Sequence, residues 1–267
     1  MVLEVSQMDA IIISHSRIDL ASGKVSEVWS SIVEGGIEFS LEHKKEIAVL
    51  APTKSYNDIE EYYSLVREAT QLTKKIILPF SKGSPEFVEM LNNFKGEIVF
   101  VNTPPPKEWK EKLTKEIPYV GLDEYLIGLT AAETLLGFKN HYRKVLVLRH
   151  EKSHEGHNLR IEGIKSSGLE VVELFIDPEK EKCVIPPKLR HLSVITLGVR
   201  GTEVALRSKS KTIIAIDSNE EVETARKEGK ILAMLLQDPK SQGKLAAEKL
   251  FSGDKKDYFM RPTILYG

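Results

Sequence analysis

The chain has 267 residues, of which 41% are hydrophobic and 29% are charged, and its formal net charge is −1 at pH 7. This is the composition of an ordinary soluble globular protein, and a charge so close to zero gives no electrostatic reason to expect nucleic acid or an anionic membrane as a partner. The single cysteine, Cys183, excludes an internal disulfide framework.

The first fifteen residues contain no basic segment, no long apolar run and no small-residue cleavage site. We therefore expect a cytoplasmic location, or an extracytoplasmic one if a signal was removed, and no insertion into a membrane. No DNA-reading helix-turn-helix precedes the first expected strand, so we expect no direct binding of nucleic acid by this chain. Lys and Glu are abundant while Gln and Asn are few, a bias seen in proteins from hyperthermophiles.

Short β-branched runs alternate with helical segments in the first part of the chain. Strands are expected at residues 9–16, 46–52, 75–81 and 97–102. Helices are expected at residues 25–43, 56–72 and 84–94. Ser84 and Pro85 form a start signal for the last of these helices. The Pro-rich stretch 103–116 interrupts this order, and we expect residues 117–125 to carry the chain into a second lobe.

The second part of the chain repeats the alternation. Strands are expected at residues 144–150, 170–176, 192–198, 212–216 and 231–236. Helices are expected at residues 124–137, 157–168, 202–208, 220–229 and 240–253. Gly229 is the expected C-cap of its helix, and residues 261–267 are expected to finish beside a hinge. Strands separated by helices in this way predict parallel sheets.

Two of these strands end in polar residues, Asp217 and Gln237. Ligands of parallel sheets bind outside the carboxyl ends of the strands, where both residues fall. A carboxylate and a carboxamide can bind the hydroxyl groups of a ligand without chemical reaction. The alternative is that Asp217 only caps the helix that follows it.

Several segments match the motifs of one family. A strand ending in Asp217, a helix ending near residues 228–230 and a strand ending in Gln237 occur in this order. Residues 120–137, VGLDEYLIGLTAAETLLG, are similar to a hinge-and-helix signature. Together these segments resemble the type I periplasmic-binding-protein-like sugar-binding family, which includes ribose-binding protein and the effector domains of lactose-repressor-type regulators. The resemblance covers nearly the whole chain.

The resemblance implies a set of ligand contacts. Trp29, in EVWSSIVEGG, matches the aromatic residue that stacks on the sugar ring, and Arg160, in HNLRIEG, matches an arginine that reaches the sugar. Taken alone, Trp29 would more often be a core residue and Arg160 a solvated helix residue. The expected ligand-binding residues are Ser14, Trp29, Asn102, Arg160, Asp217 and Gln237.

The chain departs from the family pattern at two places. Asn102 and Thr103 stand where the family usually has Asp-Arg, and Gly198 and Val199 stand where it has an Asn-Asp pair. Fewer strong hydrogen bonds are then available, so we expect weaker binding of simple hexoses than is usual in the family, or a ligand with distinct polar groups of its own.

A competing motif occurs at residues 150–154, HEKSH, which matches the zincin pattern H-E-x-x-H. Zinc chemistry needs both histidines on one face of a helix, but His150 ends an expected strand and Ser153 has the character of an N-cap. We therefore expect no bound zinc, no other metal and no cofactor. His154 and His157 remain candidates for a ligand or an adventitious metal.

The overall expectation is an α/β protein with two doubly wound parallel-sheet lobes joined by a hinge. One lobe is expected to contain residues 1–120 and 238–260, and the other residues 121–237 and 261–267. The hinge is expected at Gly121-Leu122, at Gln237-Asp238 and near Arg261-Pro262, and closure about it would be the response to a ligand. The expected function is binding or sensing of a sugar or related polyol without catalysis; the alternative is a zinc-dependent hydrolase that uses HEKSH. A homodimer, a transporter or a regulator is the expected protein partner.

Overall fold

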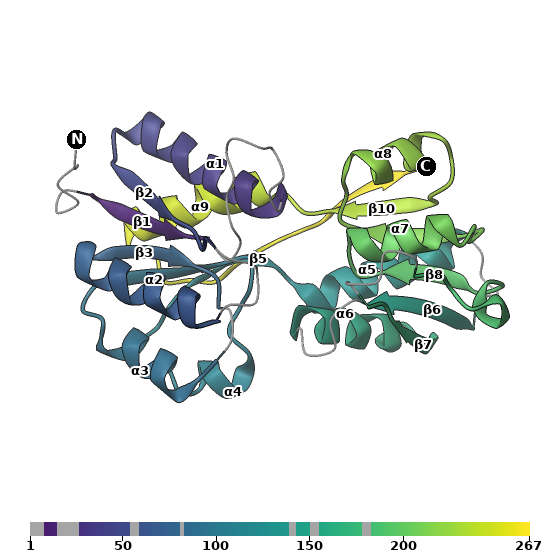
Figure 1. Cartoon of the computed structure of the whole chain (residues 1–267), viewed down its shortest axis with the longest axis horizontal. Helices are drawn as coiled ribbons and strands as arrows, with labels where there is room; N and C mark the ends of the chain where they lie inside the picture. Colours follow the sequence, from purple (N-terminus) through teal and green to yellow (C-terminus); the bar gives the residue numbers. More distant parts are fainter. Residues whose placement is uncertain are drawn as a thin grey trace. The chain divides into compact units, whose positions relative to one another are not determined.

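The chain forms two units, which are coloured along the sequence in Figure 1. The computed structural model describes residues 8–14, 27–53, 59–80, 83–138, 143–149, 155–177 and 183–267. Unit 1 comprises Met1–Gly121 and Asp238–Met260, and unit 2 comprises Leu122–Gln237 and Arg261–Gly267. Neither unit is therefore a single continuous stretch of chain.

Unit 1 is built on a six-stranded sheet with the order β11-β5-β4-β3-β1-β2. Its strands are β1 (Ala10–Ile13), β2 (Ile47–Leu50), β3 (Lys75–Leu78), β4 (Glu97–Val101), β5 (Tyr119–Leu122) and β11 (Tyr258–Met260). The strands β1 to β5 pair in parallel. Helices α1 (Glu27–His43) and α9 (Pro239–Ser252) cover one face, and α2 (Ile59–Leu72) and α3 (Pro85–Asn93) cover the other.

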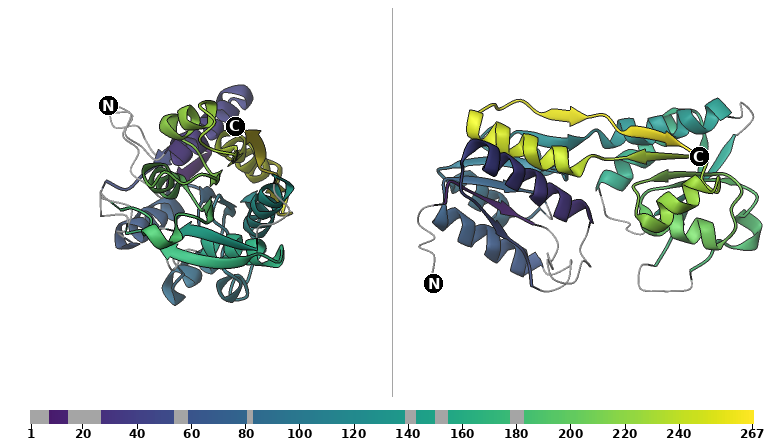
Figure 2. Two further views of the ribbon diagram at one scale, coloured as in Figure 1. Left: turned by 90° about the vertical axis from the view of Figure 1, so that its right-hand side faces the viewer. Right: turned by 90° about the horizontal axis from the view of Figure 1, so that it is seen from above.

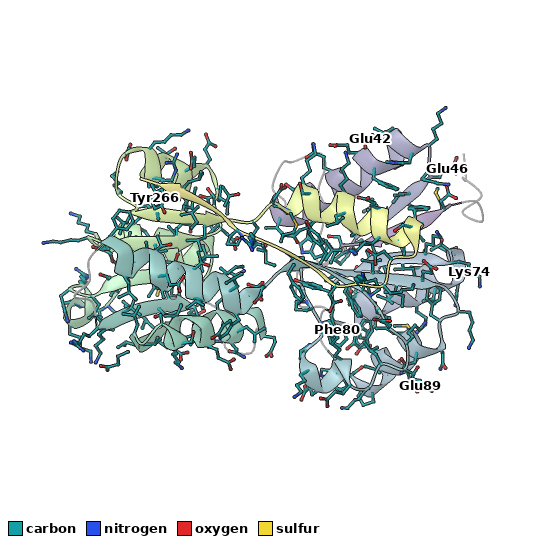
Figure 3. The ribbon with its side chains drawn as sticks, turned by 180° about the vertical axis from the view of Figure 1, so that it is seen from behind. Glu42, Glu46, Lys74, Phe80, Glu89 and Tyr266 are labelled. Carbon is teal, nitrogen blue, oxygen red and sulfur yellow. The ribbon has the colours of Figure 1, made fainter. Side chains whose placement is uncertain are left out.

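The strands of unit 1 are mostly apolar because helices cover both faces of the sheet, so that side chains on both faces are buried. Ile12 and Ile77 are fully buried on the side of α1 and α9, while Ile11 and Leu78 are fully buried on the side of α2 and α3. Phe80, labelled in Figure 3, follows β3 and is also fully buried. A short helix, α4 (Lys107–Lys110), lies in the Pro-rich stretch.

Helices α1 and α9 lie side by side in unit 1, as Figure 2 shows. Their close approach depends on glycine: a Cβ added at Gly243 of α9 would lie 1.8 Å from the backbone oxygen of Ile32 in α1. A Cβ at Gly35 of α1 would lie 1.9 Å from the backbone oxygen of Lys240 in α9. The first turns of α9 are thereby held against α1.

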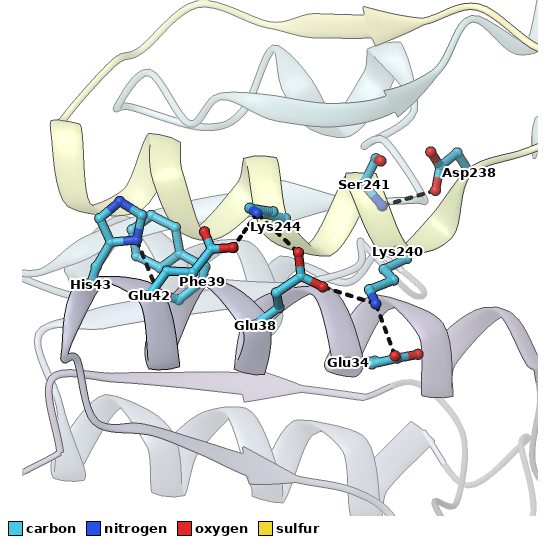
Figure 4. Close-up of polar contacts among 9 residues, drawn as sticks. All are labelled: Glu34, Glu38, Phe39, Glu42, His43, Asp238, Lys240, Ser241 and Lys244. Carbon is cyan, nitrogen blue, oxygen red and sulfur yellow. Dashed lines mark hydrogen bonds and ion pairs between the residues drawn. The ribbon is translucent and has the colours of Figure 1, made fainter.

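A ladder of charged side chains runs along this helix pair (Figure 4). The Nζ of Lys240 lies 2.9 Å from Glu34 Oε1 and 2.8 Å from Glu38 Oε2. The Nζ of Lys244 lies 2.9 Å from Glu38 Oε1 and 2.7 Å from Glu42 Oε1. Hydrogen bonds from Lys240 and then Lys244 lower the pKa of Glu38 to about 2. The ladder is exposed, so each pair contributes little by itself and the network contributes more than a single pair.

Unit 2 is built on a second six-stranded sheet, with the order β12-β10-β9-β8-β6-β7. Its strands are β6 (Lys144–Arg149), β7 (Glu170–Phe175), β8 (Ser193–Thr196), β9 (Ile213–Ile216), β10 (Ala233–Leu236) and β12 (Thr263–Tyr266). All described pairings are parallel except that of β12, which is antiparallel to β10.

In the described part of unit 2, four α-helices accompany the sheet. They are α5 (Glu124–Phe138), α6 (Glu155–Ser166), α7 (Val199–Arg207) and α8 (Glu220–Lys227). Buried side chains of α7 and α8, among them Val204 and Val222, pack with Leu146 and Ile213 of the sheet. Helices α5 and α6 are closely packed at Gly128 of α5. A Cβ added at this position would lie only 1.8 Å from the backbone oxygen of Arg160 in α6.

Two predicted helix boundaries are confirmed by their hydrogen bonds. The side chain of Ser84 accepts a hydrogen bond of 3.1 Å from the Phe87 N–H, and Pro85 occupies the first turn of α3. Gly229 follows α8 with φ +71°, and the Lys230 N–H donates to the Ala225 oxygen at 2.9 Å. This second pattern is a Schellman motif, which reverses the chain before β10.

The structure corrects the sequence interpretation at three strands. Residues 117–125 were expected only to connect the two lobes, but they contain β5, which is a strand of the unit 1 sheet. Strand β11 was not predicted, and the terminal residues 261–267 contain β12, an edge strand of the unit 2 sheet. Two helices also begin earlier than expected, α6 at Glu155 and α7 at Val199. None of the described helices is both long and apolar enough to cross a membrane.

Candidate functional site

Three neighbouring strands of unit 2, β8, β9 and β10, bring the predicted ligand residues of this unit together at their carboxyl ends. Asp217 follows β9 and Gln237 follows β10, and the Gln237 Nε2 donates a hydrogen bond of 2.6 Å to Asp217 Oδ1. Leu197 follows β8, and its backbone oxygen accepts a hydrogen bond of 2.9 Å from Arg160 NH1. The same NH1 atom lies 3.7 Å from Asp217 Oδ2.

Asp217 does not cap helix α8. The cap is Asn219, whose side chain accepts a hydrogen bond of 2.9 Å from the Val222 N–H. Asp217 itself has φ +68°, a left-handed conformation that is uncommon for a residue other than glycine. Its N–H donates to the Leu235 oxygen at 3.0 Å, which holds the residue at the strand end. Unusual backbone conformations of this kind are concentrated at functional sites.

Arg160 is buried and held by an acidic residue on another helix. Its side chain is 5% exposed, and its Nε lies 2.5 Å from Oε2 of Glu124, whose side chain is 8% exposed. Glu124 is in the first turn of α5, and α5 packs against α6 through Gly128. The guanidinium is therefore fixed in place by Glu124 and the Leu197 oxygen, and it lies beside Asp217. This contrasts with the solvated helix residue that was the alternative interpretation of Arg160.

We refer to Glu124, Arg160, Asp217 and Gln237 as the unit 2 cluster. Asp217 is its most exposed carboxylate, with a side-chain exposure of 20%. Its oxygens are oriented by a carboxamide on one side and a guanidinium on the other, an arrangement suited to accepting hydrogen bonds from hydroxyl groups.

In unit 1, Ser14 follows β1 and Asn102 follows β4, so both lie at the carboxyl ends of parallel strands. Ser14 is fully buried, and its N–H donates to the Leu50 oxygen at 2.8 Å. Asn102 has φ +64°. Its backbone N–H donates to the Val120 oxygen at 2.9 Å, and its backbone oxygen accepts a hydrogen bond of 2.9 Å from the Tyr119 hydroxyl. The Asn102 backbone is thus fixed, and its side chain is uncharged.

The Asn102 side chain has a partner that the sequence did not indicate. Its Nδ2 lies 3.4 Å from Oε1 of Gln242, which is in the first turns of α9. Gln242 is fully buried. The only signal in the sequence is its position just before Gly243, where α9 approaches α1, since such close packing buries the neighbouring residues.

Trp29 lies in the core of unit 1. The residue is 4% exposed and belongs to the apolar cluster that contains Ile12, Ile32 and Ala246. This is the alternative interpretation of the residue, and its packing gives no support to the prediction that its ring stacks on a ligand.

The zincin-like segment 150–154 lies outside the described residues, so the structure places neither His150 nor His154. His157 is described: it lies on α6 and is 5% exposed. Within the described ranges, no three or more His, Cys, Asp or Glu side chains are grouped so that they would hold a metal ion.

A surface pocket of about 900 Å³ lies elsewhere in unit 2. It is lined by residues of α8 and by the segments before β9 and β10, including Lys209, Lys211, Glu228 and Lys230. The segments before the strands lie at their amino ends, whereas ligands of parallel sheets bind at the carboxyl ends. We therefore take the unit 2 cluster, and not this pocket, as the candidate site of unit 2.

Comparison with known proteins gives a likeness in structure but none in sequence. No protein-family model matches the chain, and no curated protein matches it. A solute-binding protein of an ABC transporter from Burkholderia graminis, in complex with D-arabinose, matches with a TM-score of 0.78 and 15% identity over 98% of this chain and 96% of that chain.

Two further solved structures cover nearly the whole chain. GanP, a glucose-galactose binding protein from Geobacillus stearothermophilus, matches with a TM-score of 0.74 and 15% identity over 97% of both chains. A protein from Bacteroides fragilis that is named a putative LacI transcriptional regulator matches with a TM-score of 0.75 and 14% identity over 98% of this chain and 97% of that chain. These matches confirm the predicted fold class: the chain has the two-unit α/β fold that is shared by periplasmic sugar-binding proteins and LacI-type regulators.

Proposed function

We propose that this protein binds a sugar or a related polyol without converting it. The observation that carries the proposal is the unit 2 cluster, in which Gln237 and Arg160 orient the Asp217 carboxylate. Asp217 and Gln237 follow two adjacent strands, and Arg160 is hydrogen-bonded to the backbone oxygen that follows a third. A carboxylate held in this way accepts hydrogen bonds from two hydroxyl groups of one ligand. Similar solved structures contain D-arabinose and D-allose, which belong to the same chemical class.

The uncharged residues of unit 1 agree with a neutral ligand. Ser14 and Asn102 occupy strand ends there, and Asn102 lacks the charge that the resembling family usually has at this position. An amide and a hydroxyl group recognise hydroxyl groups by hydrogen bonds without requiring a charge on the ligand. We therefore propose neutral monosaccharides and polyols ahead of sugar acids or sugar phosphates.

Two biological uses fit this binding activity, namely delivery of the ligand to a transporter and sensing of the ligand by a regulator. Structures with this fold include proteins of both kinds, and one is the XylFII-LytSN complex. The cytoplasmic location expected from the sequence gains no support from these relatives, several of which are named as periplasmic or transporter proteins. A copurified partner would distinguish the two uses: a transporter subunit in one case, a regulator in the other.

The binding proposal is tested by thermal unfolding in the presence of D-arabinose, D-ribose, D-allose, D-galactose, myo-inositol and adenosine. A ligand present at 100 times its dissociation constant adds ~2.7 kcal/mol to the free energy of unfolding. We expect at least one sugar or polyol to raise the melting temperature in a concentration-dependent way. If none of these compounds does so at 10 mM, the proposal is refuted.

The site is tested by replacing the carboxylate at its centre. Asp217→Ala removes a charged hydrogen-bond acceptor, and we expect a loss of roughly 1.5–3 kcal/mol of binding free energy, or about 10- to 150-fold in affinity by titration calorimetry. Glu221→Gln, on the exposed side of α8, removes a carboxylate from the same region and serves as the control. Equal affinity in the wild type and Asp217→Ala would show that the ligand binds elsewhere.

A further inference from the structure

Gln242 is a buried amide whose donor end is not used. The residue is fully buried, and in the part of the chain that the structure describes its Nε2 has no hydrogen-bond partner. Its other amide atom, Oε1, faces Asn102 Nδ2 at 3.4 Å. A buried N–H group that is left without an acceptor carries a desolvation penalty, so a leucine or methionine of similar size would be the more stable choice for packing alone.

The surrounding helices keep this amide in place. Gln242 lies between Asp238, whose oxygen accepts its backbone N–H at 3.1 Å, and Gly243, which lies against α1. A Cβ at Gly243 would meet the Ile32 oxygen at 1.8 Å, so this turn of α9 is in close contact with α1 and cannot move closer to it. The side chain is therefore confined to the neighbourhood of Asn102.

The chemistry of two facing amides gives Gln242 a role. A pair of carboxamides forms one hydrogen bond in either of two senses: Asn102 donates to Gln242, as here, or Gln242 donates to Asn102 after both amides have turned over. When Asn102 donates to Gln242, the Asn102 side-chain oxygen is directed away from Gln242. When Gln242 donates to Asn102, the Asn102 side-chain nitrogen is directed away from Gln242. A polyhydroxyl ligand can use either end, because a hydroxyl group both donates and accepts.

We propose that Gln242 is a positioning residue for the ligand-binding amide of Asn102, and that it sets which end of that amide is offered to the ligand. This inference rests on the proposed function, since it assumes that Asn102 contacts a sugar or polyol. When the side chain at position 102 must accept a hydrogen bond from residue 242, the unused Nε2 of Gln242 is the donor. Unit 1 can thereby recognise hydroxyl groups of either orientation without a charged residue at position 102.

The first test needs no ligand. Asn102→Asp places at position 102 a carboxylate, which can only accept, and Gln242 Nε2 is the available donor. We expect the pKa of this carboxyl group, followed by carbon NMR, to be lower with Gln242 present than in the double variant Asn102→Asp/Gln242→Met. The expected difference is about tenfold in the acid dissociation constant, or about one pKa unit. The same pKa in both backgrounds would overturn the inference.

The second test separates positioning from packing. Gln242→Met removes the unused donor while it keeps the length of the side chain, so we expect the melting temperature to stay the same or to rise. Gln71→Met on the exposed surface of α2 is the control. A melting temperature that falls by several degrees in Gln242→Met alone would mean that Gln242 is structural, for instance through a buried water, and would overturn the inference.

The third test uses D-arabinose and D-allose as probes in titration calorimetry. For a probe that binds the wild type, we expect Gln242→Met to weaken binding five- to tenfold, and Asn102→Ala/Gln242→Met to bind no more weakly than Asn102→Ala alone. Additive losses would contradict the positioning role. If neither probe binds the wild type, the proposed function is in question, and the NMR and melting experiments still decide the role of Gln242.

Discussion

The buried pair of Arg160 and Glu124 makes a quantitative prediction about stability. Their side chains are 5% and 8% exposed, and their closest atoms are 2.5 Å apart. Removing one partner of such a pair costs roughly 3–5 kcal/mol, because the other charge is left buried without compensation. Arg160→Met leaves Glu124 without its ion-pair partner, so we expect the free energy of unfolding to fall by about 5 kcal/mol. Glu124→Met leaves Arg160 with Asp217 and the Leu197 oxygen, so we expect the free energy of unfolding to fall by about 3 kcal/mol.

The double variant discriminates between a pair that stabilises and a pair that positions. Replacing both charges by apolar groups of similar volume is often neutral or stabilising by about 1–4 kcal/mol. We therefore expect Arg160→Met/Glu124→Met to be close to the wild type in stability. The same variant should lose affinity for any sugar that binds the wild type, because Asp217 has then lost the guanidinium beside it.

The assay is unfolding in urea at pH 7 without ligand, followed by far-ultraviolet circular dichroism. The exposed pair of Arg67 and Glu86, with side chains 52% and 73% exposed, provides the control. We expect Arg67→Met to cost less than about 1 kcal/mol. The reasoning is refuted if the double variant loses the sum of the two single losses, or if both single variants lose less than about 1 kcal/mol.

Three further predictions concern packing, pH and metal. Gly128→Ala should destabilise the protein by about 1–3 kcal/mol in urea unfolding, because the added Cβ would lie 1.8 Å from a backbone oxygen of α6, whereas Gly137→Ala on the same helix, with no atom within 4 Å, should be neutral or stabilising. Glu38 has its pKa lowered from 4.5 to about 2 in the folded protein. Its stabilisation should therefore be complete above pH 4.5 and disappear as the pH falls toward 2; a stability difference between wild type and Glu38→Gln that is the same at pH 7 and pH 2 would contradict this. Purified protein should contain less than 0.1 equivalent of zinc by mass spectrometry, and one equivalent that is lost in His154→Ala would favour the hydrolase alternative.

The regular parts of the fold could be predicted from the sequence because their signals are local. The apolar run before Asp217 and the cap formed by Ser84 each act within a few residues. The three missed strands have weaker local signals. Strand β5 contains Gly121, β11 has three residues, and β12 has two exposed residues out of four. Each becomes a strand because a neighbouring strand supplies hydrogen-bond partners, and that neighbour is distant in sequence for β11 and β12.

The candidate site was predictable only in part, for a related reason. Asp217 and Gln237 end adjacent strands, so their proximity follows from the order of elements. The partner of Arg160 is Glu124 on another helix, and the partner of Asn102 is Gln242, which is far along the chain. Such pairs depend on how helices pack, and no spacing in the sequence encodes them.

The antiparallel pairing of β12 with β10 has a consequence for the design of a single-unit protein. Leu236, the last residue of β10, is paired with Thr263, the first residue of β12. Between them the chain leaves unit 2, forms α9 and β11 of unit 1, and returns. Adjacent antiparallel strands are joined in many proteins by a two-residue turn such as Asn-Gly. A short hairpin in place of the excursion would therefore turn unit 2 into one uninterrupted polypeptide that keeps Glu124, Arg160 and Asp217, so that the contribution of these three residues to ligand binding could be measured in unit 2 alone.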